Sequence, residues 1–404
     1  MTVSFSLDPT TERLRAELRT WGLAFVRPHE RVVERTLTYP DNLEEVLAAC
    51  PVSLSALAIA ELGNTAVGHD KEFVAEFGGD GSNVLAVVLA EEMSYSGAWA
   101  ANLLRSPGGT SYKVIQHVGT PEQIARWVTN QDRRGCFALT EPHFGSDASA
   151  VATTAVRDGH EWVINGTKMF ITNGAKADFA VVFATIDKAL GRDGIRAFVV
   201  EKGTPGFDVV RATEDKLGLR HTQTSQLVFD DVRVPLDHCL GGTDAPPRKG
   251  GLLGALGPLS TSRPIFSANA VGIGRAALDF ATEWILRNDD EFSEHRRRAL
   301  EQQAVRLLDR LDAASRLILR AAWMRDRGWE NRAEAAMAKA DGPSAAEIAC
   351  RWAVQVLGSQ GASEANLAEK WYRDVKVYDI FEGSGQIMSI TVSRKLLGAS
   401  ASRS

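Results

Sequence analysis

The chain has 404 residues, and 46 basic against 51 acidic side chains give it a formal net charge of −5. Its 44% hydrophobic and 24% charged residues are typical of a folded protein of two or three domains, which argues against a disordered, collagen-like or disulfide-stapled chain. The slight acidity argues against a dedicated nucleic-acid binder, because such proteins usually carry a basic field.

The four cysteines are far apart and form no Cys-x-x-Cys pair, so we expect free thiols in a reducing compartment and no structural zinc. Residues 1–22 contain no apolar segment typical of a secretory signal, and their early acidic residues are atypical of a mitochondrial transit peptide. No window approaches roughly 18 uninterrupted apolar residues. We therefore expect a cytoplasmic protein that does not span a membrane.

The sequence pattern of residues 1–130 predicts helices. Apolar residues recur at helical spacing in the segments LEEVLAAC, LAIAEL and VLAVVLAEEM, and the turn signal Gly78-Gly79-Asp80-Gly81 separates the last two. Thr120 followed by Pro121 predicts a helix start, with Thr120 as the N-cap.

Residues 131–245 have the texture of a β domain. Runs of β-branched and aromatic residues occur in FAVVFATI, IRAFVVEK and SQLVFDDVRVP, with turn signals between them. Within EWVINGTKMFIT, the pair Asn165-Gly166 lies between two β-rich runs, which predicts a tight hairpin turn.

Helices return from residue 246 onward. Val271, Gly274, Leu278, Ala281 and Ile285 form an apolar stripe at helical spacing. The Gly-x-Gly pattern at 272–274 lies within this stripe and follows no strand, so we interpret it as helix packing and not as a dinucleotide-binding loop. Gly358 is expected to end a later helix.

Five segments together carry a family resemblance. Their order and spacing resemble the acyl-CoA dehydrogenase family of flavoproteins, which implies an α+β fold. The implied domains are an N-terminal all-helical domain (1–130), a middle antiparallel β domain (131–245) and a C-terminal four-helix bundle (246–404). The segments are CFALTEPHFGSDASA, NGTKMFITNG, KLGLRHTQTSQLVFDDVRVP, VQVLGSQG and RDVKVYDIFEGSGQI.

The resemblance implies an FAD-dependent oxidoreductase that converts an acyl-CoA to the trans-2-enoyl-CoA. Glu382 matches the catalytic glutamate that removes the C2 proton, while FAD N5 takes the C3 hydride, and Gly383 would let the backbone turn toward the substrate. Arg263 matches a substrate-contacting arginine. The alternative family base would precede that arginine, and Ser262 stands there instead, which favours Glu382. Ser260 replaces an aspartate found in many relatives.

The same resemblance assigns the flavin contacts. Gly383 and Ser146 join Arg263 and Glu382 as substrate-binding residues, and Ser146 also lies near the pyrophosphate. The expected FAD-binding residues are Phe137, Leu139, Thr140, Ser146, Phe170, Ile171, Thr172, Gln355, Gly358, Gly361, Ser384 and Gln386.

The loop carrying Gln355, Gly358 and Gly361 matches one that contacts FAD bound by a neighbouring subunit, so we expect a homo-oligomer, a dimer or tetramer. Relatives carry an Arg-x-x-Phe-Gly loop that reaches the partner's FAD, whereas residues 287–293 here contain three acids and no glycine. Either Arg296–Arg298 replace that contact or FAD binds less tightly.

The acyl group stays open at this stage. The residues after Tyr95 resemble the helix that floors the acyl cavity, where Ala101 is small and Trp99 either closes the pocket or belongs to the helix core. The leading interpretation is a dehydrogenase of fatty acid metabolism that reduces an electron-transfer flavoprotein. Alternatives are a dehydrogenase of carrier-protein-tethered acyl groups, a flavin oxidase or monooxygenase, and a non-catalytic partner subunit of a hetero-oligomer. Glu382 argues against the last two.

Overall fold

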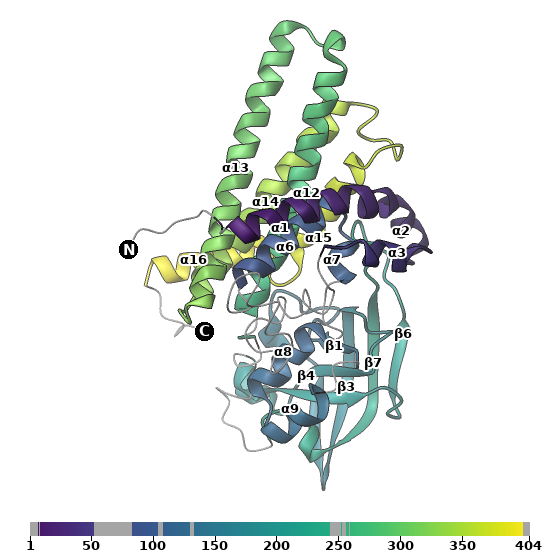
Figure 1. Cartoon of the computed structure of the whole chain (residues 1–404). Coiled ribbons are helices and arrows are strands. Elements are labelled where there is room, and N and C mark those ends of the chain that lie inside the picture. The colour runs from purple at the N-terminus through teal and green to yellow at the C-terminus, as the bar shows by residue number, and fades with distance from the viewer. Residues whose placement is uncertain are drawn as a thin grey trace. The chain divides into compact units, whose positions relative to one another are not determined.

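The computed structural model describes residues 7, 9–51, 83–103, 108–129, 133–242, 252, 256–257 and 259–398. The predicted segments LAIAEL and Gly78–Gly81 lie outside these residues. Contacts divide the chain into two compact units (Figure 1). We call Met1–Arg105, Lys216–His221 and Ser260–Ser404 the helical unit, and Ser106–Asp215 and Thr222–Leu259 the sheet unit. The predicted boundaries at 130 and 245 stay a prediction.

The sheet unit holds a seven-stranded sheet with the strand order β1-β4-β2-β3-β7-β6, and β5 pairs with β4 outside this path. Most pairs are antiparallel, but β1 and β2 pair with β4 in parallel, so the sheet is mixed. Its elements are α8 (Gly109–Val118), α9 (Pro121–Trp127), β1 (Gly135–Ala138), β2 (Thr154–Asp158), β3 (Glu161–Thr172), β4 (Phe179–Thr185), β5 (Ile195–Glu201), β6 (Phe207–Arg211) and β7 (Thr224–Pro235).

Strand β4 is buried along its whole length. Because successive side chains of a strand point to opposite faces, it contributes to two apolar cores. Ala180 and Val182 belong to the core shared with β3 and β7, whereas Val181 and Phe183 belong to the core shared with α8 and α9. The continuous apolar run in the sequence therefore reflects a strand covered on both sides.

The predicted hairpin at Asn165-Gly166 is wrong, because β3 runs unbroken through both residues. The hairpin lies earlier, where Asp158 of β2 faces Glu161 of β3. The Asn165 side chain instead pairs with Asp231, accepting a hydrogen bond from its backbone N–H at 2.8 Å. Gly166 lies at an irregularity in the β3–β7 register. The predicted helix cap is confirmed, since Thr120 forms a capping box with Gln123 at the start of α9.

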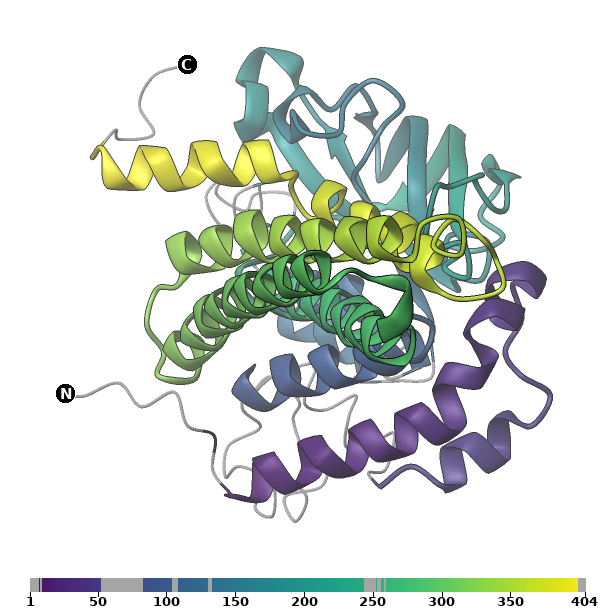
Figure 2. The ribbon, with the colours of Figure 1, turned by 90° about the horizontal axis from the view of Figure 1, so that it is seen from above.

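The helical unit consists of helices from both ends of the chain. α13 and α16 each lie alongside α14 (Figure 2). Its helices are α1 (Pro9–Trp21), α2 (Glu30–Thr36), α3 (Leu43–Ala48), α6 (Asn83–Ser96), α7 (Ala100–Leu103), α12 (Leu259–Arg287), α13 (Glu294–Asp326), α14 (Arg332–Leu357), α15 (Ala368–Ile380) and α16 (Gly385–Leu396).

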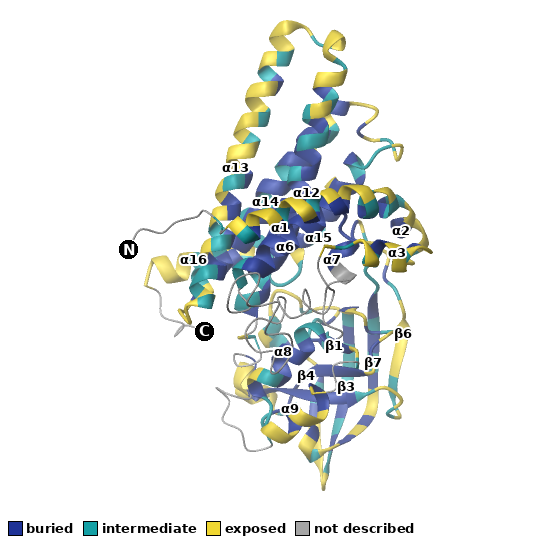
Figure 3. Cartoon of the chain, viewed as in Figure 1, coloured by how far each residue is buried: buried dark blue, intermediate teal, exposed yellow. Residues whose placement is uncertain are grey.

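Helix α12 is closely packed between α6 and α14, and Figure 3 shows how heavily these three helices are buried. A Cβ on Gly272 would lie 2.1 Å from the Glu91 carbonyl oxygen of α6, and one on Gly274 would lie 2.8 Å from the Ala346 Cα of α14. The predicted helical interpretation of this Gly-x-Gly pattern is confirmed. Gly358 ends α14, as predicted. Among the described residues, no helix is long and apolar enough to cross a membrane.

We predict that Gly272→Ala destabilises the protein by about 1–3 kcal/mol, because the added methyl group meets backbone atoms that cannot rotate away. Elsewhere in a helix, alanine is about 0.5–1 kcal/mol more favourable than glycine, so the sign itself is diagnostic. Urea denaturation measures the effect. The control Glu283→Ala, on the exposed side of α12, is expected to stay within about 0.5 kcal/mol of wild type. A stabilised Gly272→Ala protein would show that α6 and α12 are not in close contact.

Candidate active site

The candidate base lies in a left-handed turn between α15 and α16. Glu382 has φ +62° and Gly383 has φ +99°. A left-handed conformation is unusual for a residue with a side chain and is found where the surrounding structure imposes it, often at functional sites. Ser384 then caps α16, its side chain accepting a hydrogen bond from the Ile387 N–H at 3.5 Å.

Two neighbouring residues of α12 hold Glu382. The Arg263 Nε donates a hydrogen bond to the Glu382 carbonyl oxygen at 3.0 Å. The Ser262 hydroxyl donates one to the Glu382 carboxylate Oε2 at 2.8 Å. One residue therefore fixes the backbone and the other orients the carboxylate. The structure thus brings together Glu382, Gly383 and Arg263, as the sequence predicted, and gives Ser262 a direct contact that the sequence did not suggest.

A third contact comes from α14. The Lys339 Nζ donates a hydrogen bond to the Gly383 carbonyl oxygen at 3.1 Å. Burial lowers the pKa of Lys339 to about 8, a shift that the carboxylates of Asp379 and Glu382 oppose. Burial likewise lowers the pKa of Arg263, and Glu382 again opposes the shift.

The start of α12 is adapted to a proline. Pro264 has no N–H, so it cannot bond the carbonyl of Ser260 one turn earlier. The Asn331 side chain donates to that carbonyl at 3.3 Å instead. Ser260, which replaces the aspartate of many relatives, is thus held through its backbone.

Aromatic side chains surround the residue before the base. Phe381 packs edge-on against Phe266, with ring centroids 4.9 Å apart, and lies 5.4 Å from the Tyr378 ring. Trp99 is fully buried, and its indole N–H donates to the Val26 carbonyl, which supports the interpretation as helix core. Ala101 is buried as well.

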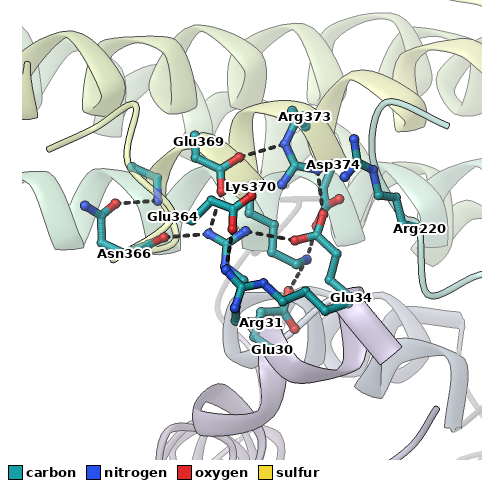
Figure 4. Close-up of polar contacts among 12 residues, drawn as sticks. Glu30, Arg31, Glu34, Arg220, Glu364, Asn366, Glu369, Lys370, Arg373 and Asp374 are labelled. Carbon is teal, nitrogen blue, oxygen red and sulfur yellow. Dashed lines mark hydrogen bonds and ion pairs between the residues drawn. The ribbon is translucent and has the colours of Figure 1, made fainter. Parts of the chain in front are cut away.

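Helix α15, which leads to Glu382, is anchored by a buried lysine (Figure 4). Lys370 pairs with Asp374 one turn later and, at 2.8 Å, with Glu30 of α2. These carboxylates raise the pKa of Lys370 against the effect of burial. Asp374 also accepts a hydrogen bond from the Leu219 N–H, and Glu30 accepts one from the Ala98 N–H. One cation therefore joins α15 to segments far away in sequence.

Two arginines extend this cluster, and Figure 4 shows them on either side of Glu34 and Glu369. Arg373 pairs with both carboxylates and donates to the Leu217 carbonyl at 3.0 Å. Arg31, which lies on α2, pairs with the same two carboxylates. The alternation of charges leaves α15 little freedom to slide or rotate, which fixes the point at which the Glu382 turn begins.

In the sheet unit, the predicted flavin residues Leu139 and Thr140 follow β1. The Met169 N–H donates to the Thr140 carbonyl at 2.9 Å, which ties this segment to β3. The buried Lys168 donates to the Leu139 carbonyl at 3.2 Å and to the Glu141 carboxylate at 2.7 Å. Burial lowers the pKa of Lys168 to about 8, although Glu141 favours its charged form.

A bulge in β3 exposes the second predicted flavin segment. The register with β7 shifts between Lys168 and Ile171, so two residues of β3 face one of β7. Phe170 adopts φ +58° there and is 52% exposed. Thr172 is exposed and Ile171 is buried. An exposed aromatic ring in an unfavourable conformation, followed by an exposed hydroxyl, fits contact with a flat heteroaromatic group such as a flavin.

The remaining predicted flavin residues are distributed over both units. Phe137 is half-buried and packs edge-on against Phe183 in the sheet unit, where Ser146 is exposed. In the helical unit, Gln355, Gly358 and Gln386 are exposed. Gly361 is buried, and a Cβ there would lie 2.4 Å from the Val354 carbonyl oxygen.

The unusual 287–298 segment satisfies its charges locally. Arg297 pairs with Asp289 at 2.8 Å, and Arg298 pairs with Glu294. The hydroxyl of Ser293 caps α13 by accepting from the Arg296 N–H at 3.2 Å. The basic run therefore neutralises part of the acidic loop before it.

Lys168, Lys339 and Glu141 are among the charged residues that sequence reasoning missed, and the two lysines left a signal. Lys168 occupies an inward position of β3, in alternation with the buried Trp162 and Ile164. Lys339 lies at helical spacing from the buried Ala335 and Gly342. A lysine at a position where the pattern requires an apolar residue indicates a buried charge with a specific partner. Glu141 carried no comparable signal.

Comparisons with known proteins agree with this geometry. Residues 136–232 match the model of the acyl-CoA dehydrogenase middle domain, and residues 249–397 match that of the C-terminal domain. The mitochondrial short-chain specific acyl-CoA dehydrogenase of Bos taurus is 38% identical over 328 residues, covering 80% of this chain and 78% of the relative.

Solved structures agree as well. The butyryl-CoA dehydrogenase of Megasphaera elsdenii is 28% identical and covers 98% of this chain and 100% of its own, with a TM-score of 0.82. A chain from work on the electron transferring flavoprotein of Acidaminococcus fermentans is 30% identical, with a TM-score of 0.79, and covers 98% of this chain and 100% of its own.

The chain belongs to the acyl-CoA dehydrogenase family. It has the family's fold and is an FAD-dependent enzyme of that class. The predicted family, fold class, enzyme class and cofactor are therefore confirmed.

We predict that the two partners of the buried ion pair respond unequally to mutation. Glu141 accepts hydrogen bonds from four donors: Lys168, the Ala152 N–H, and the Thr153 N–H and hydroxyl. Glu141→Ala leaves a buried cation and two backbone N–H groups without their acceptor and is expected to cost about 3–5 kcal/mol. Lys168→Met leaves the carboxylate three donors and is expected to cost about 1–3 kcal/mol.

Urea denaturation measures both losses, and Lys188→Met, at an exposed site of the same unit, is the control for removal of a lysine. Equal losses for Glu141→Ala and Lys168→Met would mean that the ion pair outweighs the hydrogen bonds to Glu141.

Proposed function

We propose that this enzyme removes the C2 proton of an acyl-CoA with Glu382 and forms the trans-2-enoyl-CoA. The observation that carries the proposal is the left-handed turn at Glu382, with the carbonyl held by Arg263 and the carboxylate by Ser262. A carboxylate placed in this way can accept a proton, and general-base catalysis is worth about 10²–10⁴-fold in rate. When bound, FAD accepts the hydride from C3.

The residues of the chain divide the remaining tasks. Ser262 orients the Glu382 carboxylate through the hydrogen bond to its Oε2, and this carboxylate is proposed to meet the substrate. Arg263 holds the carbonyl of residue 382 and so fixes the turn, and the N–H of the same residue is proposed to hold the thioester oxygen, as in the family. In the sheet unit, Thr140, Phe170 and Thr172 are proposed as flavin contacts, and Ser146 as a contact of the pyrophosphate and the thioester.

The short-chain and butyryl-CoA relatives favour a short acyl chain for this enzyme. We propose an electron-transfer flavoprotein as the electron acceptor. The family resemblance implies this role, and the similar chain from work on such a flavoprotein agrees with it.

Anaerobic mixing with a panel of acyl-CoAs tests the proposed chain length, because the flavin bleaches with true substrates. Acyl-pantetheine and acyl-carrier-protein thioesters in the same panel test whether the CoA nucleotide is needed.

We predict that Glu382→Gln keeps the fold and FAD but slows flavin reduction by at least about a hundredfold, because an amide cannot accept the C2 proton. Stopped-flow absorbance with butyryl-CoA measures the rate. Substrate binding should persist as a shift of the flavin spectrum without bleaching. Glu330→Gln, at an exposed site, is the control for the change of charge. A near wild-type rate for Glu382→Gln would place the base elsewhere.

We predict that the FAD-loaded protein is a dimer or tetramer and that Gln355→Ala lowers its FAD content. The reason is that the end of α14 at Gln355 and the turn that follows it, as far as Gly361, are proposed to contact the flavin of a neighbouring subunit. Sedimentation velocity with detection at the flavin absorbance measures both properties. Gln360→Ala, in the same loop, is the control and should retain FAD. A stable FAD-loaded monomer would contradict the shared site.

A further inference from the structure

Lys339 is a buried cation that the reaction proposed above does not use. It lies on α14 with 0% exposure and is among the largest fully buried side chains of the described chain. Within the described part of the chain, its ammonium group makes one hydrogen bond, to the Gly383 carbonyl, and no ion pair within 4.0 Å. Burying a charge without a paired counter-ion is costly, so such a residue requires an explanation.

Two other fully buried lysines of the described residues show the ordinary solution. Lys370 pairs with two carboxylates, and Lys168 pairs with one. Both therefore have a counter-ion in direct contact. Lys339 instead contacts the face of the Phe381 ring, with its Nζ 6.0 Å from the centroid, and a carbonyl of the turn that carries Glu382.

The charged groups around Lys339 come from two helices, α12 and α15, and from the turn itself. Arg263 of α12 is a second cation, Asp379 of α15 is an anion, and Glu382 belongs to the turn. Lys376 is held by Asp379 at 3.2 Å and by Glu347 at 3.1 Å, so Asp379 is shared with another cation. Asp379 and, less strongly, Glu382 are therefore the carboxylates that favour the charged form of Lys339, and by reciprocity the charge of Lys339 favours an ionised carboxylate at Glu382.

We propose that Lys339 is a positioning residue for Glu382: its hydrogen bond to the Gly383 carbonyl holds the left-handed turn, and its charge keeps the carboxylate ionised. Arg263 of α12 and Lys339 of α14 then donate hydrogen bonds to two successive carbonyls, those of residues 382 and 383. Ser262 acts on the side chain and the two cations act on the backbone. The electrostatic half of this proposal, that the charge of Lys339 keeps Glu382 ionised, rests on the proposed function of Glu382. The structural half, that the hydrogen bond holds the turn, does not depend on that function.

Two variants separate the two halves. Lys339→Met removes both the donor and the charge, whereas Lys339→Gln keeps a donor and removes only the charge. Lys188→Met, at an exposed site of the sheet unit, is the control for removal of a lysine. Lys376 is unsuitable as a control, because it shares Asp379 with Lys339.

The first measurement is hydrogen exchange at the start of α16 in the FAD-loaded protein, where the N–H groups of Ile387 and Met388 bond to Ser384. Lys339→Met should exchange about tenfold faster there, as expected for the loss of one charge-assisted hydrogen bond, and Lys339→Gln should exchange less rapidly than Lys339→Met. Unchanged exchange in Lys339→Met would overturn the structural half. If Lys339→Met does not fold, Lys339→Gln carries the comparison with wild type.

The second measurement is the pH dependence of flavin reduction by butyryl-CoA under anaerobic conditions. A base must be ionised, and loss of a nearby cation raises the pKa of a carboxylate by about 1–3 units. The acid limb should therefore move upward by about one pH unit in both Lys339 variants and stay in place in Lys188→Met. A merely structural lysine would lower the rate without moving this limb, and that result would overturn the electrostatic half. If wild type and Lys188→Met also failed to reduce the flavin with any acyl-CoA, the proposed function would fail. The exchange data would still decide whether Lys339 holds the Gly383 carbonyl.

Discussion

The geometry of the candidate base depends on how closely α12 approaches its neighbours. Gly272 and Gly274 present only backbone to α6 and α14, so the helices approach more closely than any side chain would permit. Ser262 and Arg263 lie on α12, and Lys339 lies on α14, so this spacing determines whether all three reach the turn at Glu382. The geometry of the candidate base is therefore set in large part by residues that have no functional group.

Buried charge is used in three different ways in this chain. In the cluster around Lys370, alternating charges join α15 to α2 and to the 216–221 segment. The Glu141–Lys168 pair fixes the backbone that carries Leu139 and Thr140. At Lys339, a cation without a contacting carboxylate is directed at a carbonyl. The first two arrangements approach local neutrality, whereas the third leaves an electrostatic bias, and it does so beside the proposed base.

Much of this fold could be predicted from the sequence, because periodicity and capping are local. The stripe through Val271 and Leu278, the cap at Thr120 and the stop at Gly358 all formed as expected. The predicted turn at Asn165-Gly166 did not form, because the pairing of β3 with β7 outweighed the local turn preference. The resemblance pointed to Glu382 and Arg263. It indicated only that Ser262 is not the family's alternative base, and not that it contacts Glu382. The partners of Lys168 and Lys339 lie 27 and 44 residues away, so no local pattern could identify them.

The double burial of β4 has a consequence for how the chain can change in length. One residue inserted into or deleted from this strand would exchange its side chains between two cores of different composition, moving phenylalanines into a space occupied by alanines. Neither core could accommodate the exchange. β6, by contrast, is largely exposed and, among the described strands, pairs only with β7. Length variation among homologues should therefore accumulate there and in the exposed 188–193 segment, and be absent from β4.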